Sequence, residues 1–345
     1  MRKKVFWVIA IALVLTANSI PASNAGTTPK IRIAIAYDLG GRGDHGINDA
    51  VATGVDFIKK KYGLTSLDVR EMVTNGSEAD RQERIAFLAA ARYALVVAVG
   101  NKYEQAVRQA SAKYPKTQFS IINDAHIANL NVINLTFSAT DGAYLAGVLA
   151  AAASKRLKIG FFGLSSDSNG YQAFALGAQS VSRKVITFSQ YADSDPISGI
   201  DALIAEEVDV IYSEWSSTSE VQDAITALST KDNPIYLIGI SPEQYFLLEK
   251  NSQKILLGAV TKRIDLAAED VMTAALTRGV IKSVLDPTLG IFGRNYRAAD
   301  GGVSMALTSI GTPYSKYVSA AIKALKSGKV KLRDQPGYSS ITQSN

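Results

Sequence analysis

The sequence predicts an α/β protein of two lobes, each built on a parallel sheet with helices on both of its faces. Short apolar runs alternate along the chain with amphipathic stretches, which is the order of elements in α/β folds. The runs lack polar residues at alternate positions, as in Ile33-Ala34-Ile35-Ala36, and this is typical of strands covered on both faces. About 320 residues follow an N-terminal segment described below, more than one hydrophobic core usually holds, so we expect two lobes.

The predicted elements fall into two series. The apolar runs of the first series predict strands at residues 32–37, 68–73, 95–99, 118–122 and 132–137. Those of the second series predict strands at residues 158–162, 185–188, 208–212, 235–240 and 254–260. Helical patterns separate many of the strands, at residues 47–61, 78–91, 104–113, 144–154, 171–181, 220–228 and 264–278.

The boundary between the lobes is expected at Lys155-Arg156-Leu157-Lys158, where an alanine-rich helix ends and a new strand begins. The first lobe then comprises residues 26–155 and about 261–285, and the second comprises residues 156–260 and about 286–345. No long linker rich in proline, glycine or serine separates them, so short crossings should join the lobes as a hinge. In open α/β sheets ligands bind at the carboxyl ends of the strands, and we expect the functional residues there.

Residues 1–25 have the features of a secretory signal peptide. Met1-Arg2-Lys3-Lys4 is basic, residues 5–17 are almost wholly apolar, and Ser23-Asn24-Ala25 offers small residues to a signal peptidase. The apolar run is shorter than the roughly 20 residues that a membrane-spanning helix needs. We therefore expect a periplasmic or secreted protein that meets the membrane only through a partner or through an uncleaved signal.

Composition narrows the functions that this chain can perform. It has no cysteine, which excludes disulfides, thiol catalysis, cysteine-bound metals and a lipid attached to a cysteine after the signal. The formal net charge of +6 falls to +3 after the signal, because 3 basic residues precede Gly26, and this gives no reason to expect a nucleic-acid partner. Two scattered histidines argue against a catalytic zinc site. No metal and no cofactor is expected, and a monomer is expected.

A glycine-rich stretch follows the first predicted strand. Gly41-Arg42-Gly43-Asp44-His45-Gly46 has the G-x-G-x-x-G spacing of a dinucleotide-binding loop. However, Asp38 precedes the glycines and Asp44 lies among them, and carboxylates so close to a pyrophosphate would repel it. We interpret the glycines as a turn in which Asp44 caps the next helix, while Asp38, at the end of a buried strand, accepts hydrogen bonds from a polar uncharged ligand.

Asp38, Asp44, Asn48 and Gly54 have a spacing that resembles the opening D-x-G-G-x-x-D-x-S-F-N-x(5)-G of the basic membrane protein family. This family comprises solute-binding proteins of ABC importers, with a two-lobed type I periplasmic-binding-protein fold. Four further segments are similar to family motifs. Residues 114–124 resemble Y-P-x-x-x-F-x-x-x-D, and residues 131–147 resemble N-V-x-x-x-x-F followed by G-x-x-x-G. Residues 262–265 resemble K-R-V-D, and residues 300–303 resemble G-G-V. The series covers nearly the whole chain after the signal, in order.

The resemblance implies a ligand pocket between the lobes, which in several family members takes a purine nucleoside. By matching position, Asp38 and Asn48 would hydrogen-bond the base, and Asp124 would line the first lobe. Lys262 would reach the ligand or the opposite lobe. The resemblance also implies an ABC permease as the partner that receives the ligand. Asn48 has a physical case of its own, because an amide offers both a donor and an acceptor to the edge of a heterocycle.

Three positions depart from the family pattern. Ile47 replaces a phenylalanine, which removes an aromatic stacking surface, and Ser241 stands where an aspartate would hold ribose hydroxyls. Residues 214–218 replace a glycine-rich A-G-G-x-G segment. Within them Trp215 offers a new stacking face for a ring ligand, although packing between lobes suits it equally. Tyr212 and Glu214 point the same way if they lie on a strand, and either is a candidate polar contact.

An enzyme is the weaker hypothesis. Gly239-Ile240-Ser241-Pro242-Glu243 lacks the last glycine of a G-x-S-x-G nucleophile elbow, and both His45 and His126 precede the serine, whereas a hydrolase needs its histidine after it. The sequence therefore predicts a non-enzymatic binding protein that delivers a small polar ligand, a nucleoside or related heterocycle, to an ABC importer. A secreted ligand sensor and an extracytoplasmic hydrolase are the alternatives, because a fold does not fix a function.

Overall fold

The computed structural model describes residues 31–163, 168–191, 196–214, 234–240, 250–281 and 284–334. The predicted signal peptide, the helix predicted at residues 220–228 and the candidate site residues Trp215 and Ser241 lie outside the described residues. Within the described ranges, no helix combines the length and the apolar character needed to cross a membrane.

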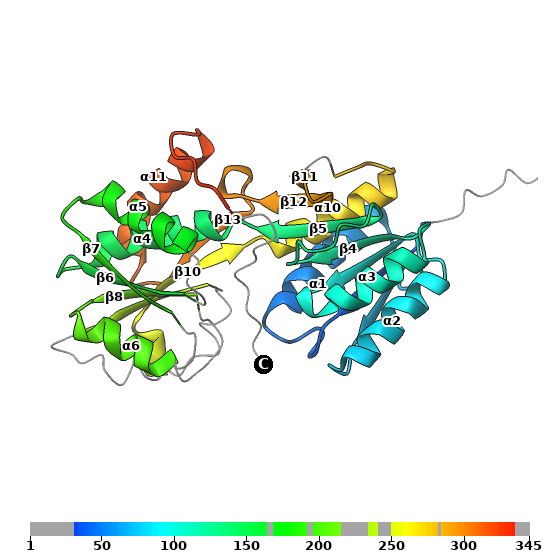
Figure 1. Ribbon diagram of the computed structural model, residues 1–345, viewed down its shortest axis with the longest axis horizontal. Coiled ribbons are helices and arrows are strands. Elements are labelled where there is room, and N and C mark those ends of the chain that lie inside the picture. The colour runs from blue at the N-terminus through cyan, green and yellow to red at the C-terminus, as the bar shows by residue number, and fades with distance from the viewer. Residues whose placement is uncertain are drawn as a thin grey trace, which may run out of the picture. The chain divides into compact units, whose positions relative to one another are not determined.

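The first lobe is built on a seven-stranded sheet in the order β11-β12-β5-β4-β3-β1-β2 (Figure 1). Neighbouring strands run parallel except β11, which is antiparallel to β12. The strands are β1 (Ile33–Tyr37), β2 (Val69–Val73), β3 (Leu95–Val99), β4 (Gln118–Ile122), β5 (Val132–Phe137), β11 (Val284–Asp286) and β12 (Ile291–Tyr296). The helices of this lobe are α1 (Ile47–Tyr62), α2 (Glu78–Ala90), the short η1 (Asn101–Tyr103), α3 (Glu104–Lys113) and α10 (Ile264–Thr277).

The second lobe is built on a six-stranded sheet in the order β13-β10-β9-β8-β6-β7, in which only β13 is antiparallel to its neighbour. The strands are β6 (Lys158–Gly163), β7 (Ile186–Tyr191), β8 (Val210–Ser213), β9 (Tyr236–Gly239), β10 (Leu256–Lys262) and β13 (Val303–Leu307). The remaining elements are α4 (Ala139–Ala153), α5 (Ser168–Val181), α6 (Pro196–Ala205), α9 (Lys250–Gln253), η2 (Ala298–Asp300), η3 (Thr312–Tyr314) and α11 (Ser315–Lys326). The predicted α/β fold of two lobes is confirmed.

The lobe boundaries predicted from the sequence need two corrections. Helix α4 packs against α5, β8 and β10, so the chain enters the second lobe near Ser138 and not at residues 155–158. Strand β12 pairs in parallel with β5, so residues 291–296 belong to the first sheet, although they had been assigned to the second lobe. The alanine-rich helix α4 is buried along nearly its whole length, so it belongs to the core of the second lobe and does not mark the end of the first.

Helices α4 and α5 approach each other so closely that each presents a glycine to the other. A β-carbon at Gly147 would lie 2.0 Å from the carbonyl oxygen of Phe174, and one at Gly177 would lie 2.1 Å from that of Tyr144. Both distances are far shorter than any van der Waals contact, so only glycine fits at these two positions. The contact is reciprocal, and it fixes how closely α4 and α5 pack against each other.

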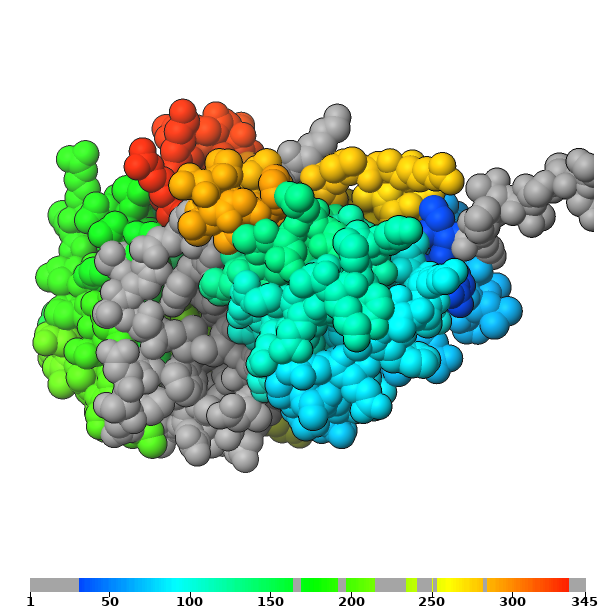
Figure 2. All heavy atoms as spheres, turned by 45° about the vertical axis from the view of Figure 1, so that its right-hand side comes forward, coloured from blue at the N-terminus to red at the C-terminus, as the bar shows by residue number. Residues whose placement is uncertain are grey.

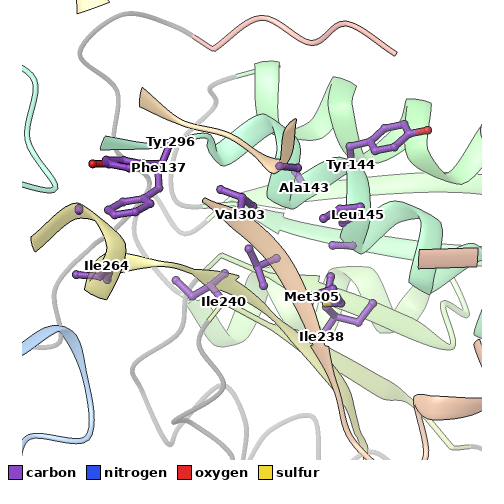
Figure 3. Packing of buried hydrophobic residues seen from close by; sticks show 14 of the residues in the cluster. Phe137, Ala143, Tyr144, Leu145, Ile238, Ile240, Ile264, Tyr296, Val303 and Met305 are labelled. Carbon is purple, nitrogen blue, oxygen red and sulfur yellow. The ribbon is translucent and has the colours of Figure 1, made fainter. Parts of the chain in front are cut away.

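Buried apolar side chains form one large cluster that includes residues from both sheets. Figure 3 shows part of it, with Val303 and Met305 of β13 and Ile238 of β9. At the end of β5 and β12 the rings of Phe137 and Tyr296 stack, with their centroids 5.2 Å apart. Helices α2 and α3, coloured cyan, form part of the outer surface of the first lobe (Figure 2), and this placement agrees with their polar faces.

Three crossings of the chain run between the lobes, and hydrogen bonds tie them together. The Ser138 amide donates to the Tyr296 carbonyl at 2.8 Å, and the Arg263 amide donates to the Gly302 carbonyl at 2.9 Å. The carboxylate of Asp334, which follows the last helix, then spans two of the crossings. It accepts from both hydroxyls and one amide at the start of α4 and from the side-chain amide on β12, at 2.7–3.1 Å: Ser138 Oγ, Thr140 Oγ1, Thr140 N and Asn295 Nδ2.

Candidate ligand-binding site

The loop between β1 and α1 is organised around the carboxylate of Asp44. This carboxylate accepts the backbone N–H groups of Gly46, Asn48 and Asp49 at 2.8–3.2 Å, and the side-chain amide of Asn48 at 2.8 Å. Two of these N–H groups belong to the first turn of α1, so Asp44 caps this helix as predicted. The N–H groups that would bind a pyrophosphate are therefore already engaged. Positive φ angles explain the glycines at positions 40, 41 and 43.

Asp38 lies directly after β1 and forms a largely buried ion pair with Arg81 of α2. Its Oδ1 accepts from Arg81 Nε at 3.1 Å and from a terminal nitrogen of the guanidinium at 2.7 Å. The exposed fractions of the two side chains are only 14% for Asp38 and 6% for Arg81. The guanidinium also lies over the ring of Tyr103, 5.7 Å from its centroid, and the Tyr103 hydroxyl donates to the Tyr37 carbonyl at 2.8 Å. The Asp38 carboxylate is thus oriented by the guanidinium of Arg81, which comes from α2.

Asn48 is buried in the first turn of α1, and its amide bonds to the loop itself. Its Oδ1 accepts the Asp38 N–H at 3.0 Å, and its Nδ2 donates to the Leu39 carbonyl at 3.2 Å and to Asp44. The structure therefore brings Asn48 next to Asp38, as the family resemblance implies. Among the described residues, the Asn48 amide contacts Asp38 and its loop and holds them in position. A contact between this amide and a ligand stays a prediction.

Asp124 is the second residue after β4, which lies between β3 and β5 in the sheet, and its side chain is almost completely buried. Its Oδ1 accepts the His126 N–H at 2.7 Å and lies 3.2 Å from His126 Nδ1. Its Oδ2 is the one buried side-chain oxygen or nitrogen without a hydrogen-bond partner among the described residues. Burial raises the pKa of this carboxyl, and the nearby charge of Glu104 adds to the rise. An unpartnered buried oxygen is costly, and a ligand that donates a hydrogen bond would remove the cost.

The family segment that ends in aspartate is displaced by one residue at this point. Counted from Phe119, the spacing F-x-x-x-D falls on Asn123, and Asp124 is the next residue. Asn123 is buried and has a φ of 72°, which leaves its backbone in the left-handed region that asparagine tolerates better than most residues. Its N–H donates to the Leu135 carbonyl at 2.6 Å. Asn123 therefore forms the turn, and the carboxylate lies one position further along.

Glu104, Asp124 and His126 offer one ligand atom each, and these atoms lie within 4.8 Å of one another. A metal ion would have to compete with Arg108, whose guanidinium donates to Glu104 and to the His126 carbonyl. Because the Arg108 guanidinium already pairs with Glu104, these three residues suit a hydrogen-bond donor of an organic ligand better than a metal cation.

The second lobe contributes a buried carboxylate and a lysine at the carboxyl edge of its sheet. Glu214 comes directly after β8, is 6% exposed, and donates its N–H to the Phe162 carbonyl at 2.8 Å. Lys262 is the last residue of β10. Burial lowers the pKa of Lys262 to about 8, while the charge of Glu214 acts in the opposite direction. Burial, and then the charge of Glu214, raises the pKa of Tyr212.

The structure groups the described candidates by lobe. Asp38, Asn48 and Asp124 lie at the carboxyl edge of the first sheet, where β1, β3 and β4 are neighbours, and Lys262 lies at that of the second sheet. Arg81 was not predicted as a site residue, because the sequence around it has the pattern of charged residues on the exposed face of a helix. No local signal identifies the partner, since Asp38 is 43 residues away in sequence.

The sequence is similar to those of known substrate-binding proteins. Residues 30–291 match the family model of PnrA-like substrate-binding proteins of ABC transporters. The nucleoside-binding protein BmpA of an ABC transporter from Lactococcus lactis is 27% identical, over 96% of this chain and 99% of its own. A CD4+ T-cell-stimulating antigen from Listeria monocytogenes is 26% identical over 70% of this chain and 73% of its own.

Solved structures share the fold. A solute-binding protein of an ABC transporter system from Conexibacter woesei superposes with a TM-score of 0.64 at 16% identity, over 88% of this chain and 98% of its own. A transcriptional activator of the comK gene from Bacillus halodurans also reaches 0.64, at 19% identity, over 87% of this chain and 99% of its own. At these identities the likeness concerns the fold alone, whereas the family model matches well over half of the sequence. The chain therefore belongs to the family of PnrA-like substrate-binding proteins of ABC transporters.

Proposed function

We propose that this protein is an extracytoplasmic binding protein that captures a nucleoside, or a related heterocycle, between its two lobes and delivers it to an ABC permease. The observation that carries the proposal is the unpartnered Oδ2 of Asp124, a buried hydrogen-bond acceptor at the edge of the sheet where ligands bind in α/β folds. The N–H groups of a heterocycle are donors of the kind that this oxygen lacks.

The neighbouring residues support the same ligand class. Asp38 is held in one orientation by Arg81 and by the amide of Asn48, so its carboxylate is a preorganised acceptor. The name of the Lactococcus relative, a nucleoside-binding protein, supports the ligand class, and the predicted signal peptide supports a location outside the cytoplasm.

The experiment is isothermal titration calorimetry of the expressed protein with purine and pyrimidine nucleosides, nucleobases and free pentoses. Asp124→Asn is expected to weaken nucleoside binding by at least about tenfold, because the amide no longer offers a carboxylate acceptor. Asp201→Asn, the same change at an exposed carboxylate on α6, is the matched control and should leave the affinity unchanged. Equal affinity in the wild-type protein and Asp124→Asn, or no binding of any nucleoside or nucleobase, would contradict the proposal.

A further inference from the structure

The loops that lead into the strands of the first sheet lie side by side along its amino edge, opposite to the candidate site. The strands of this part of the sheet have the order β5-β4-β3-β1-β2 and are all parallel, so their first residues meet at the same edge. Four backbone hydrogen bonds of 2.8–3.0 Å join neighbouring loops there: Ile33 N to Asp68 O, Ala94 N to Arg32 O, Gln118 N to Ala94 O, and Phe119 N to Asn131 O.

This amino edge is strongly cationic. No aspartate or glutamate occurs in residues 59–67, 91–94, 113–117 or 128–131, and Asp68 is buried, where it accepts hydrogen bonds from Thr65. In the part of the chain that the structure describes, no carboxylate forms an ion pair with any of the six exposed cations of the edge: Arg32, Lys60, Lys61, Arg92, Lys113 and Lys116. Segments far apart in the sequence supply these charges, so the net charge of the chain does not indicate them.

Two leucines protrude from the same edge. Leu130 is 87% exposed and Leu67 is 83% exposed, more than any other large apolar side chain among the described residues. Leu130 precedes β5 and Leu67 precedes β2, which are four strand spacings apart in the sheet, or about 19 Å. The cations of the loops before β4, β3 and β1 lie between the two leucines. The amino edge therefore combines a row of positive charge with an apolar side chain at each end.

The last two turns of α1 add aromatic rings to this surface. Lys61 Nζ lies 5.8 Å from the centroid of the Phe57 ring and 5.4 Å from that of the Tyr62 ring, and both rings are exposed. Aromatic rings and lysine side chains both suit a boundary between apolar and aqueous phases, because each has an apolar body, and the lysine has a charged tip that reaches water or phosphate.

The predicted signal peptide joins the described chain at this edge, at Ile31. The apolar run of the signal covers residues 5–17, so the connection is residues 18–30. Fully extended, this connection spans at most about 45 Å. As long as the signal is held in a membrane, the amino edge of the first sheet therefore stays within that distance of the membrane.

A bilayer that contains anionic phospholipids satisfies all of these groups at once. Its phosphates attract the lysines and arginines, and its interfacial region accepts the leucines and the aromatic rings. A soluble polyanion would pair with the cations and leave the leucines in water. We propose that the amino edge of the first sheet docks on an anionic phospholipid bilayer, through residues 31–32, 57–67, 91–94, 113–117 and 128–131. Docking of this kind does not depend on the ligand, because the candidate site lies at the opposite edge of the sheet.

The test is co-sedimentation of the chain without residues 1–25 with phosphatidylcholine vesicles that contain about 30% phosphatidylglycerol, and with pure phosphatidylcholine vesicles. Residues 31–345 form a compact unit by themselves, so the signal is not needed for the fold. The partition coefficient is expected to be at least about tenfold higher for the anionic vesicles. It should fall by at least about tenfold when NaCl is raised from about 0.1 to about 0.5 M, because salt screens exposed charges.

Two variants test the two kinds of contact separately. Lys60→Gln/Lys113→Gln/Lys116→Gln should lower the partition into anionic vesicles by at least about tenfold. Leu67→Ser/Leu130→Ser should lower it by at least about fivefold while the salt dependence remains. The matched controls are three exposed lysines and one exposed leucine of the second lobe, whose substitution should leave the partition unchanged: Lys323→Gln/Lys326→Gln/Lys329→Gln and Leu176→Ser.

The substituted side chains are exposed, so the midpoint of urea unfolding should be the same in all variants and in the wild-type protein. Equal partition of the wild-type protein into both kinds of vesicle would overturn the proposal, as would equal losses in the lysine variant and its control. A loss in the lysine variant with none in the leucine variant would overturn it too, because the cations would then serve a soluble polyanion such as a nucleic acid.

Discussion

Removal of Arg81 is expected to destabilise the protein more than removal of any exposed arginine. The guanidinium makes two hydrogen bonds to Asp38 Oδ1, at 3.1 and 2.7 Å, and its side chain is 6% exposed. Arg81→Ala leaves the Asp38 carboxylate, itself only 14% exposed, without its counter-charge. Breaking such a buried pair from one side costs about 3–5 kcal/mol of unfolding free energy, because the remaining charge stays in a poorly solvated position.

A double-mutant cycle separates the ion pair from the packing of the arginine. Asp38→Asn/Arg81→Met replaces both charges by neutral side chains of similar length and should recover most of the loss, to within about 1–2 kcal/mol of the wild-type protein. The assay is urea unfolding followed by circular dichroism at pH 7. Arg84→Ala, three residues along the same helix at a more exposed ion pair with Asp80, is the control and should have a far smaller effect.

Purely additive effects of Asp38→Asn and Arg81→Met in the double variant would contradict this prediction. Additivity would mean that the two side chains do not depend on each other, so that Arg81 could not be what orients Asp38. If the reasoning holds, Arg81→Ala should also weaken nucleoside binding, because the carboxylate loses its fixed position before the ligand arrives.

Four further predictions follow from the described contacts. Burial raises the pKa of Asp124 in the folded state, so the destabilising contribution of this one carboxyl should shrink as pH falls from 7 towards 4; in urea unfolding, Asp124→Asn should add about 1 kcal/mol relative to the wild-type protein at pH 7, and less at pH 4. The pKa of Lys262 is about 8, so ligand affinity measured by calorimetry should fall as pH rises from 7 to 9, and Lys262→Met should remove this dependence. Gly147→Ala should lower the unfolding free energy by about 1–3 kcal/mol in urea, because the added carbon meets a backbone carbonyl of α5; an unchanged midpoint would mean that the helices can separate. Asp334→Ala should cost about 3 kcal/mol, because four hydrogen bonds at the crossings are lost; a change below about 0.5 kcal/mol would show that the crossings do not depend on this carboxylate.

The sequence predicted the central strands of both sheets because these strands are apolar on both faces. It missed β11, β12 and β13, which lie towards the edges or pair antiparallel and include polar residues such as Arg294 and Ser304. It placed the start of α4 five residues too late, at Tyr144. The overlooked signal is Ser138, whose hydroxyl accepts the Asp141 N–H at 3.1 Å and caps the helix.

Within the candidate site, the sequence predicted the interactions between residues that are close together in the chain. Asp44 caps α1 across a few residues, and this role was predicted correctly. The Asp38–Arg81 pair and the unpartnered oxygen of Asp124 depend on which elements the fold brings together, and no local pattern carries that information. The roles of Trp215 and Ser241 stay predictions, since both lie outside the described residues.

The return of β12 to the first sheet sets the order in which the protein can be completed. Strand β12, which pairs with β5, lies more than 150 residues further along the chain, and strands β6 to β10 are synthesised before it. Neither sheet has all its strands until the last sixth of the chain is available, and contacts so distant in sequence form slowly.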